Sequence, residues 1–248
     1  MRILERIVHS IPRLDAAEGW SVRFGRELNA TDDRGHFHGG PAFAQGSGAA
    51  GRGGLPVLEG KHIEPFRVHA DRSTLRISEH SASRLLDAAT TFSRARLAYR
   101  DVASSTNRLS LIAAVLPAGV VTTHSLFCLK TMLSGDNQAF LCAMLNSYVA
   151  NYLVRQVMTT HLGSATVEAL RVPKPRYDSP LFGEIVELAH ALRRAHEDEA
   201  LARVQALAAC CYGLTTDEFG HVLSTFPLVD QTARGRTLEE FRRDDLLS

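Results

Sequence analysis

Residues 55–68, LPVLEGKHIEPFRV, and residues 92–108, FSRARLAYRDVASSTNR, decide the fold that this chain should adopt. Each stretch contains short runs rich in apolar and β-branched residues next to turn-forming residues, a pattern typical of strands. The second stretch holds four Arg and a single acidic residue. In a strand, Arg94, Arg96 and Arg100 would project on the same side, because residues two apart share a face. The sequence therefore predicts a cationic surface carried by strands.

Further strands are expected on both sides of these stretches. Residues 20–28 alternate between apolar and polar, residues 109–116 form a continuous apolar run, and residues 125–131 form another short run. Residues 29–54 contain the tract GSGAAGRGG, whose composition predicts a flexible loop. The first part of the chain is thus predicted to be rich in strands.

Helical spacing then replaces the strand pattern. Residues 137–157 carry apolar side chains at helical intervals, and a further helix is expected over residues 201–212. Asp178 or Ser179 is a suitable cap for a helix whose first turn contains Pro180. Two sequences in the tail fit the capping box, in which a Thr and a Glu three residues later bond each other's backbone N–H. They are Thr215 to Glu218 and Thr237 to Glu240.

These patterns together predict an α+β fold, in which a strand-rich recognition domain precedes a helical tail. We expect an N-terminal helix and linker over residues 1–19, a target-recognition domain over residues 20–175, and a helical subdomain over residues 176–248. With 248 residues, 45% of them hydrophobic and 22% charged, the composition is that of an ordinary globular protein.

Charge is distributed unevenly along the chain. Residues 1–124 hold 16 Lys and Arg against 12 Asp and Glu, whereas residues 125–248 hold 12 against 15. Almost every cation is Arg, since Lys61, Lys130 and Lys174 are the only lysines. Arg forms paired bonds to phosphate and to guanine edges, which suits nucleic acid, although a coding bias towards Arg would give the same composition. Any anion-binding face is therefore expected in the first half.

Two further observations restrict the class of protein. The four cysteines show no two-residue-spaced pair, so neither a zinc site nor a disulfide framework is indicated, and we interpret them as reduced core residues. The longest apolar run, residues 111–121, contains Pro117 and is too short to span a bilayer. We expect a cytoplasmic protein without a membrane partner.

Catalytic patterns are sparse. Glu59, Gly60 and Lys61 follow the Glu-x-Lys pattern of metal-dependent nucleases, in which two carboxylates hold the ion, and Asp33 (or Asp32) could supply the first carboxylate. Gly60 favours a turn there instead. A metal-dependent nuclease using Asp33, Glu59 and Lys61 stays an alternative, as does a protein-interaction module docked through the helical tail.

Four stretches in fixed order resemble a known family. They are SVRFGRELNATDDRGHF (21–37), LPVLEGKHIEPFRV (55–68), RLAYRDVASSTNRLSLIAAVLPAGVVTTHS (96–125) and FLCAMLNSYVANYLVRQVMTTHLGSATVEALRVPKP (140–175). In this order they resemble the target-recognition region of type IIG restriction–modification enzymes. These are adenine-specific DNA methyltransferases with a TaqI-like C-terminal specificity domain, and they act in phage defence.

The resemblance implies that several residues lie close to DNA without being catalytic. With the basic run, the expected contacts are Lys61, His62, Arg67, Arg94, Arg96, Arg100, Thr106, Asn107, Arg108, His124, Thr160 and His161. In that family an upstream domain binds S-adenosylmethionine, flips the adenine and methylates its exocyclic amine, and some members add a magnesium-dependent nuclease.

The chemical half of such an enzyme has no counterpart in this sequence. No Gly-rich cofactor loop follows a strand, and no Asn/Asp-Pro-Pro-Tyr/Phe tetrapeptide occurs. We therefore expect sequence-specific recognition of double-stranded DNA, with no catalytic, metal or cofactor-binding residues in this chain. A methyltransferase catalytic domain or subunit would be its partner and would bind the S-adenosylmethionine.

Overall fold

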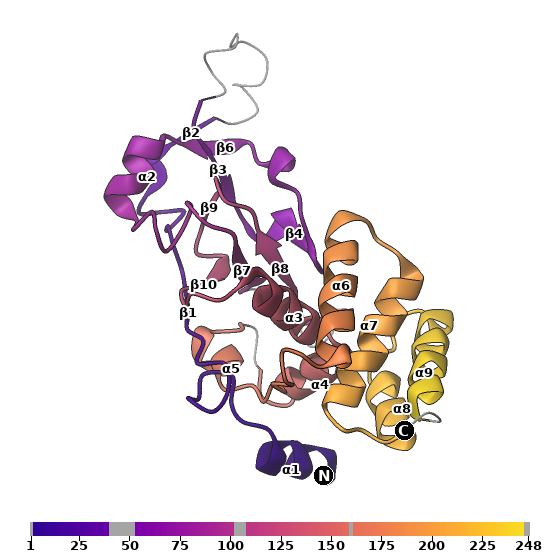
Figure 1. The fold of residues 1–248 in the computed structure, drawn as a ribbon. Coiled ribbons are helices and arrows are strands. Elements are labelled where there is room, and N and C mark those ends of the chain that lie inside the picture. The colour runs from indigo at the N-terminus through magenta and orange to yellow at the C-terminus, as the bar shows by residue number, and fades with distance from the viewer. Residues whose placement is uncertain (1, 40–52, 102–107, 159–160, 246–248) are drawn as a thin grey trace.

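The computed structural model describes residues 2–39, 53–101, 108–158 and 161–245. Its fold is α+β, as expected: strands dominate the first half and helices the second (Figure 1). In the described part of the chain, no helix is both long enough and apolar enough to pass through a membrane.

Two four-stranded sheets and one hairpin make up the strand-rich half. The first sheet has the order β1-β10-β7-β8 and is antiparallel throughout, and the second has the order β2-β6-β3-β9, in which β3 and β9 run parallel. Strands β4 and β5 form the hairpin. The bounds are β1 Phe24–Gly25, β2 Phe37–Gly39, β3 Leu55–Leu58, β4 Ile63–Glu64, β5 Arg67–Val68, β6 Leu75–Ile77, β7 Arg96–Arg100, β8 Ala113–Leu116, β9 Val121–Thr122 and β10 Leu126–Leu129.

Strand β7 is covered on both faces. Leu97 and Tyr99 belong to the large core cluster that includes the helices, whereas Ala98 packs in a second cluster with Leu58 and Ile63. This alternation follows from the two-residue period of a strand. Side chains on the same face as Ala98, including those of Arg96 and Arg100, therefore point towards the second cluster rather than away from the protein.

Residues 63–68, at the end of the first stretch expected to form strands, fold as this hairpin. Phe66 has a φ of 68°, a left-handed conformation that is rare for a residue with a bulky side chain. Pro65, which precedes it, has no N–H to donate to a sheet. The chain consequently reverses at these two residues, and the Phe66 N–H bonds the carbonyl oxygen of Ala113 at 3.0 Å.

In the described residues, five helices precede the tail: α1 Arg2–Ser10, α2 Glu79–Leu85, α3 Gly135–Leu145, α4 Tyr148–Arg155 and α5 Ser164–Glu168. Helix α1 lies at the foot of the molecule, away from the strands (Figure 1). The single helix predicted over residues 137–157 is divided into α3 and α4. Ser147 starts the second of these by accepting a hydrogen bond from the Ala150 N–H at 3.0 Å. Helix α2, which is capped by Ser78, was not predicted.

Four helices form the tail, with bounds α6 Pro180–Arg194, α7 Asp198–Cys211, α8 Thr216–Ser224 and α9 Gln231–Asp245. Ser179 caps α6, and the predicted capping box between Thr215 and Glu218 is present at α8. The box predicted at Thr237 is wrong, because Thr237 lies inside α9 and its hydroxyl bonds the Ala233 carbonyl. One core cluster includes Ile3 and Phe241, so the tail packs onto the rest of the chain.

The four cysteines are free, as expected, although only Cys128 and Cys142 are fully buried. Burial raises the pKa of both of these thiols to about 12. Cys210 and Cys211 are half-buried in the last turn of α7. The two buried thiols are therefore inert at neutral pH, because the thiolate is the reactive form.

Candidate nucleic-acid interface

Ser125 joins three segments that are far apart in the sequence. It lies in the turn between β9 and β10, where its hydroxyl accepts from the Gly60 N–H at 3.0 Å. Its carbonyl oxygen accepts from the Asp101 N–H at 3.0 Å. The short 3-10 turn Gly60–His62 and the end of β7 are thus brought to the same place. All three segments carry residues that the sequence analysis assigned to DNA contact.

A fourth segment reaches this place through the backbone of Asp101. Its carbonyl oxygen accepts from the Leu162 N–H at 2.9 Å, which brings His161 alongside. The Nδ1 atom of His161 lies 3.7 Å from Oδ1 of Asp101, and the His161 side chain is 64% exposed. Predicted contact residues from the second half of the chain therefore meet those from the first half.

The carboxylate of Asp101 is buried and only half satisfied. Its Oδ2 accepts from Nη2 of Arg26 at 2.8 Å, whereas Oδ1 is buried without a hydrogen-bond partner. The Arg26 guanidinium lies 4.7 Å above the ring of Phe127 and its side chain is 47% exposed. We call Arg26, Asp101, Phe127 and His161 the Asp101 surface. Asp101 thus pairs with Arg26 and not with Arg100, its neighbour in the sequence.

Arg26 was missed by the sequence reasoning. It lies within the first stretch of the family resemblance, yet the Asp101 that orients it is 75 residues away along the chain. No local pattern in the sequence connects the two residues. The family resemblance included residues 21–37, and the structure shows that Arg26 is the residue in this stretch that pairs with Asp101.

Two of the expected contacts near Ser125 are tied to the protein itself. Arg100 is half-buried, and its Nε donates to the Ile63 carbonyl at 3.0 Å. Burial lowers the pKa of this guanidinium. Lys61 is exposed over 69% of its side chain and pairs with Glu59 at 2.6 Å. Of the two, Lys61 is the more exposed, and a ligand anion would have to displace Glu59 from it.

Two of the expected histidines, His62 and His124, are not freely exposed, unlike His161. His62 is buried, and its Nδ1 accepts from the Glu59 N–H at 2.8 Å, so its ring is turned into the protein. Burial, reinforced by the positive charge of Lys61, lowers the pKa of His62. His124 is half-buried, and its Nδ1 accepts from the Ala30 N–H at 3.2 Å.

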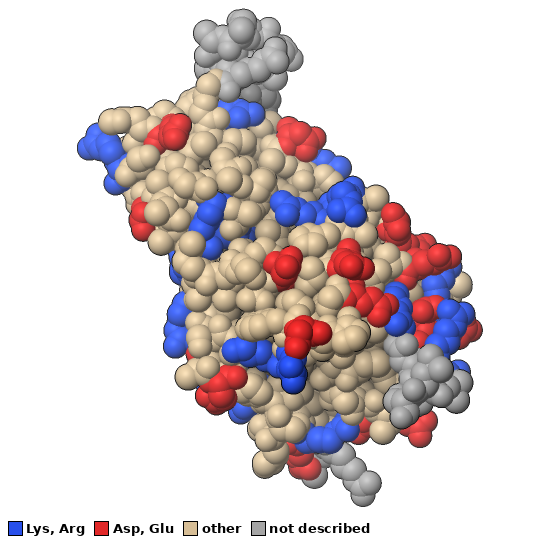
Figure 2. All heavy atoms as spheres, in the orientation of Figure 1, with Lys and Arg blue, Asp and Glu red and all other residues tan. Residues whose placement is uncertain are grey.

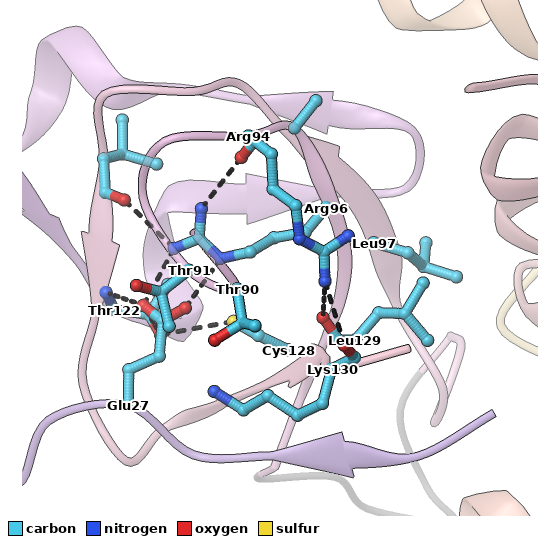
Figure 3. Close-up of polar contacts among 12 residues, drawn as sticks. Glu27, Thr90, Thr91, Arg94, Arg96, Leu97, Thr122, Cys128, Leu129 and Lys130 are labelled. Atoms are coloured by element: carbon cyan, nitrogen blue, oxygen red, sulfur yellow. Dashed lines mark hydrogen bonds and ion pairs between the residues drawn. The ribbon is translucent and has the colours of Figure 1, made fainter. Parts of the chain in front are cut away.

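The prediction of an exposed cationic face on β7 is wrong for Arg96. Figure 3 shows its guanidinium in a bonded cluster with Glu27. Nε of Arg96 bonds Oε1 of Glu27 at 2.6 Å and Nη2 bonds Oε2 at 2.8 Å, and both side chains are 0% exposed. The same carboxylate accepts from the Thr122 N–H at 2.8 Å and from its hydroxyl at 3.0 Å. Arg96 therefore holds the two sheets together.

Arg94 is likewise engaged with the backbone. Its Nη2 donates to the carbonyl oxygens of Leu129 at 2.9 Å and Lys130 at 3.2 Å, at the end of β10 (Figure 3). Burial lowers the pKa of its guanidinium. The prediction that Arg94 presents its charge to a ligand is therefore corrected as well. The physical reason is that Arg94 precedes β7, where its half-buried guanidinium packs against the carbonyl groups at the end of β10.

Arg67 and Arg108 meet at a pocket between the hairpin and the tail. Arg67 is half-buried and its Nη2 bonds Oε2 of Glu64 at 2.5 Å, a contact that lowers the pKa of Glu64. Arg108 is exposed. The pocket has a volume of about 340 Å³. Its other walls are largely apolar and include Phe66, Leu109, Ile112, Leu192 and Leu201.

The remaining predicted contacts are Thr106, Asn107 and Thr160, which lie outside the described residues.

The residues of the nuclease alternative do not form a metal centre in the described part of the chain. No three His, Cys, Asp or Glu side chains gather there as they would around an ion. The carboxylate of Glu59 is paired with Lys61, and Asp33 Oδ2 instead accepts from the Asn29 N–H at 2.7 Å. The geometry gives this alternative no support.

Charge does not form one continuous cationic field on the face shown in Figure 2, where Lys and Arg are interspersed with Asp and Glu. Within the described residues, the cations of the candidate interface are also paired with acids, as in Arg26–Asp101, Lys61–Glu59 and Arg67–Glu64. Any recognition at this surface therefore depends on placed donors and acceptors as well as on net charge.

Comparison with known proteins gives little beyond the geometry. No protein-family model matches the chain, and no curated relative matches it. Among solved structures, it is similar to a chain from a study of complex assembly and conformational transition of the type I R-M system. That match has 12% identity and a TM-score of 0.39, and it covers 85% of this chain and 51% of the other. The chain thus spans about half the length of that protein, and the match is too distant to carry an argument.

Proposed function

We propose that this chain recognises a specific sequence in double-stranded DNA, as the specificity part of an adenine-specific DNA methyltransferase or restriction–modification system. The single observation that carries the proposal is the convergence at Ser125. The stretches that resemble target-recognition regions lie far apart in the sequence. Even so, the Gly60 N–H bonds the Ser125 hydroxyl, the Asp101 N–H bonds the Ser125 carbonyl, and the Leu162 N–H bonds the Asp101 carbonyl.

The chemistry at this surface suits a duplex edge. Lys61 offers an exposed positive charge that could exchange Glu59 for a phosphate, and phosphate contacts position a protein on DNA without reading its sequence. Arg26, Asp101 and His161 offer donors and an acceptor for base edges. The mixture of acidic and basic groups fits the reading of bases better than it fits non-specific attraction to the backbone.

In this proposal the chain does not perform the chemistry. A methyltransferase domain or subunit would bind S-adenosylmethionine, extrude the adenine and transfer the methyl group. An accompanying nuclease would require magnesium. The present chain would set where on the duplex these events occur.

The test is a binding titration with fluorescent duplex DNA, followed by selection from a pool of random duplex sequence. We expect retention of duplexes and enrichment of a defined motif. Affinity should fall with rising salt by a power law whose exponent reflects the number of phosphates contacted. Binding that is equal for all duplex sequences, or absent, would contradict the proposal. A nuclease would be revealed by magnesium-dependent cleavage that is lost in Glu59→Ala.

A further inference from the structure

Among the described residues, no group forms a hydrogen bond with Oδ1 of Asp101, which is buried. Buried polar atoms are almost always hydrogen-bonded, and leaving one unbonded is costly. His161 does not satisfy it, because the 3.7 Å separation of Nδ1 and Oδ1 is too long for a hydrogen bond. The His161 ring is exposed, and exposed side chains change rotamer rapidly. We take movement of this ring as the step that gives an outside donor access to Oδ1.

Arg26 lies next to this acceptor with donors to spare. A guanidinium has five N–H groups, and among the described residues the one hydrogen bond that Arg26 makes is to Asp101. Contact with the Phe127 ring, 4.7 Å away, holds the plane of the guanidinium in place. The result is a fixed pair of groups, in which a donor fork lies beside an acceptor.

This pair has the pattern of one base-pair edge. In the major groove a G·C pair presents the N7 and O6 acceptors of guanine beside the N4 amino donor of cytosine. An A·T pair would instead place the adenine N6 donor against the second N–H of the Arg fork. We infer that Arg26 and Asp101 together read one G·C pair, with Arg26 on guanine and Asp101 on cytosine. This inference rests on the proposed function and identifies part of its target.

The experiment compares the motifs selected from random duplex DNA by the full chain and by two variants. In Asp101→Asn the amide oxygen would keep the bond from Arg26, which leaves an N–H group facing the cytosine amine. We expect this variant to lose its preference at one G·C pair by roughly 5- to 150-fold, with the other positions unchanged. Arg26→Gln should lose preference at the same pair.

Asp178→Asn is the matched control, because Asp178 forms a similar pair with Arg176 in front of α6. It should select the wild-type motif, and thermal unfolding verifies that all variants are folded. If the wild type selects a motif and Asp101→Asn selects the same one, the inference is overturned while the proposed function stands. The inference would also be overturned if Asp101→Asn weakened the base preference equally at every position of the motif. If the wild type shows no sequence preference, both fail.

Discussion

Arg96 and Glu27 form a doubly bonded ion pair that is completely enclosed by protein. The bonds are 2.6 and 2.8 Å long, and they connect β7 with the segment that follows β1 (Figure 3). Glu27 also accepts from the backbone and hydroxyl of Thr122 in β9. One carboxylate thus joins the first sheet to the second. What the sequence presents as a basic surface residue is a structural group.

Removal of Arg96 should therefore destabilise the protein before it affects any ligand. We expect Arg96→Met to lower the free energy of unfolding by about 3–5 kcal/mol, because it leaves the Glu27 carboxylate buried without its cation. Urea denaturation measures the change. Arg176→Met, in an exposed pair, is the control and should leave the urea midpoint in place. Equal midpoints for both variants would contradict the structural role of Arg96.

Asn151 should be a second point of high sensitivity. Its Oδ1 accepts from the backbone N–H groups of Ser110 and Leu111, both at 2.8 Å, in front of β8. Asn151→Leu retains the approximate volume of the side chain but leaves two buried N–H groups without an acceptor. Each unsatisfied donor costs about 1–3 kcal/mol. We expect the free energy of unfolding to fall by about 2–5 kcal/mol in urea titrations. Gln156→Leu, which changes an exposed amide just after α4, should lower the free energy of unfolding by far less. Comparable losses in the two variants would refute the role of Asn151 as the acceptor for these N–H groups.

Arg96 and Asn151 show what the sequence alone does not predict, namely which distant residues a side chain contacts. The positions of β3, β7, β8 and β10 follow from local apolar runs, and α6 and α8 follow from their caps. The local pattern around Arg96 is also right, since it is in a strand and shares a face with Arg100. Whether that face is exposed depends on Glu27, which is 69 residues away. Pairings of this kind are set by tertiary packing.

The candidate site shows the same limit. The segments that the resemblance selected do meet near Ser125, and Lys61 and His161 lie in them. The resemblance could not distinguish an exposed side chain such as Lys61 from its neighbour His62, which turns inward to bond the Glu59 backbone. It also passed over Arg26 and Asp101, because an acid among arginines suggests simple charge neutralisation in sequence.

His62 should make stability depend on pH. Its pKa is lowered in the folded state from the ordinary 6.5, so the unfolded chain binds a proton first as the pH falls. Stability is therefore complete above about pH 6.5 and declines as the pH falls below it towards the folded pKa. We expect urea midpoints to fall between pH 7.5 and 5, and to fall less in His62→Gln. His36→Gln, at an exposed position, should keep the wild-type dependence, and the same slope in all three proteins would refute the role of His62.

Lys61 offers the clearest test of phosphate contact under the proposed function. Its side chain is 69% exposed beside the Gly60–Ser125 bond, so removal of its charge should not disturb the fold. Because each phosphate neutralised by a cation releases counterions, Lys61→Gln should reduce the slope of log affinity against log salt by about 0.9. The selected motif should stay the same, since a point charge on phosphate reads no bases. Arg194→Gln removes an equal charge from the end of α6 and should leave the slope unchanged. Equal slopes for wild type and Lys61→Gln in fluorescence titrations would place the duplex elsewhere on the protein.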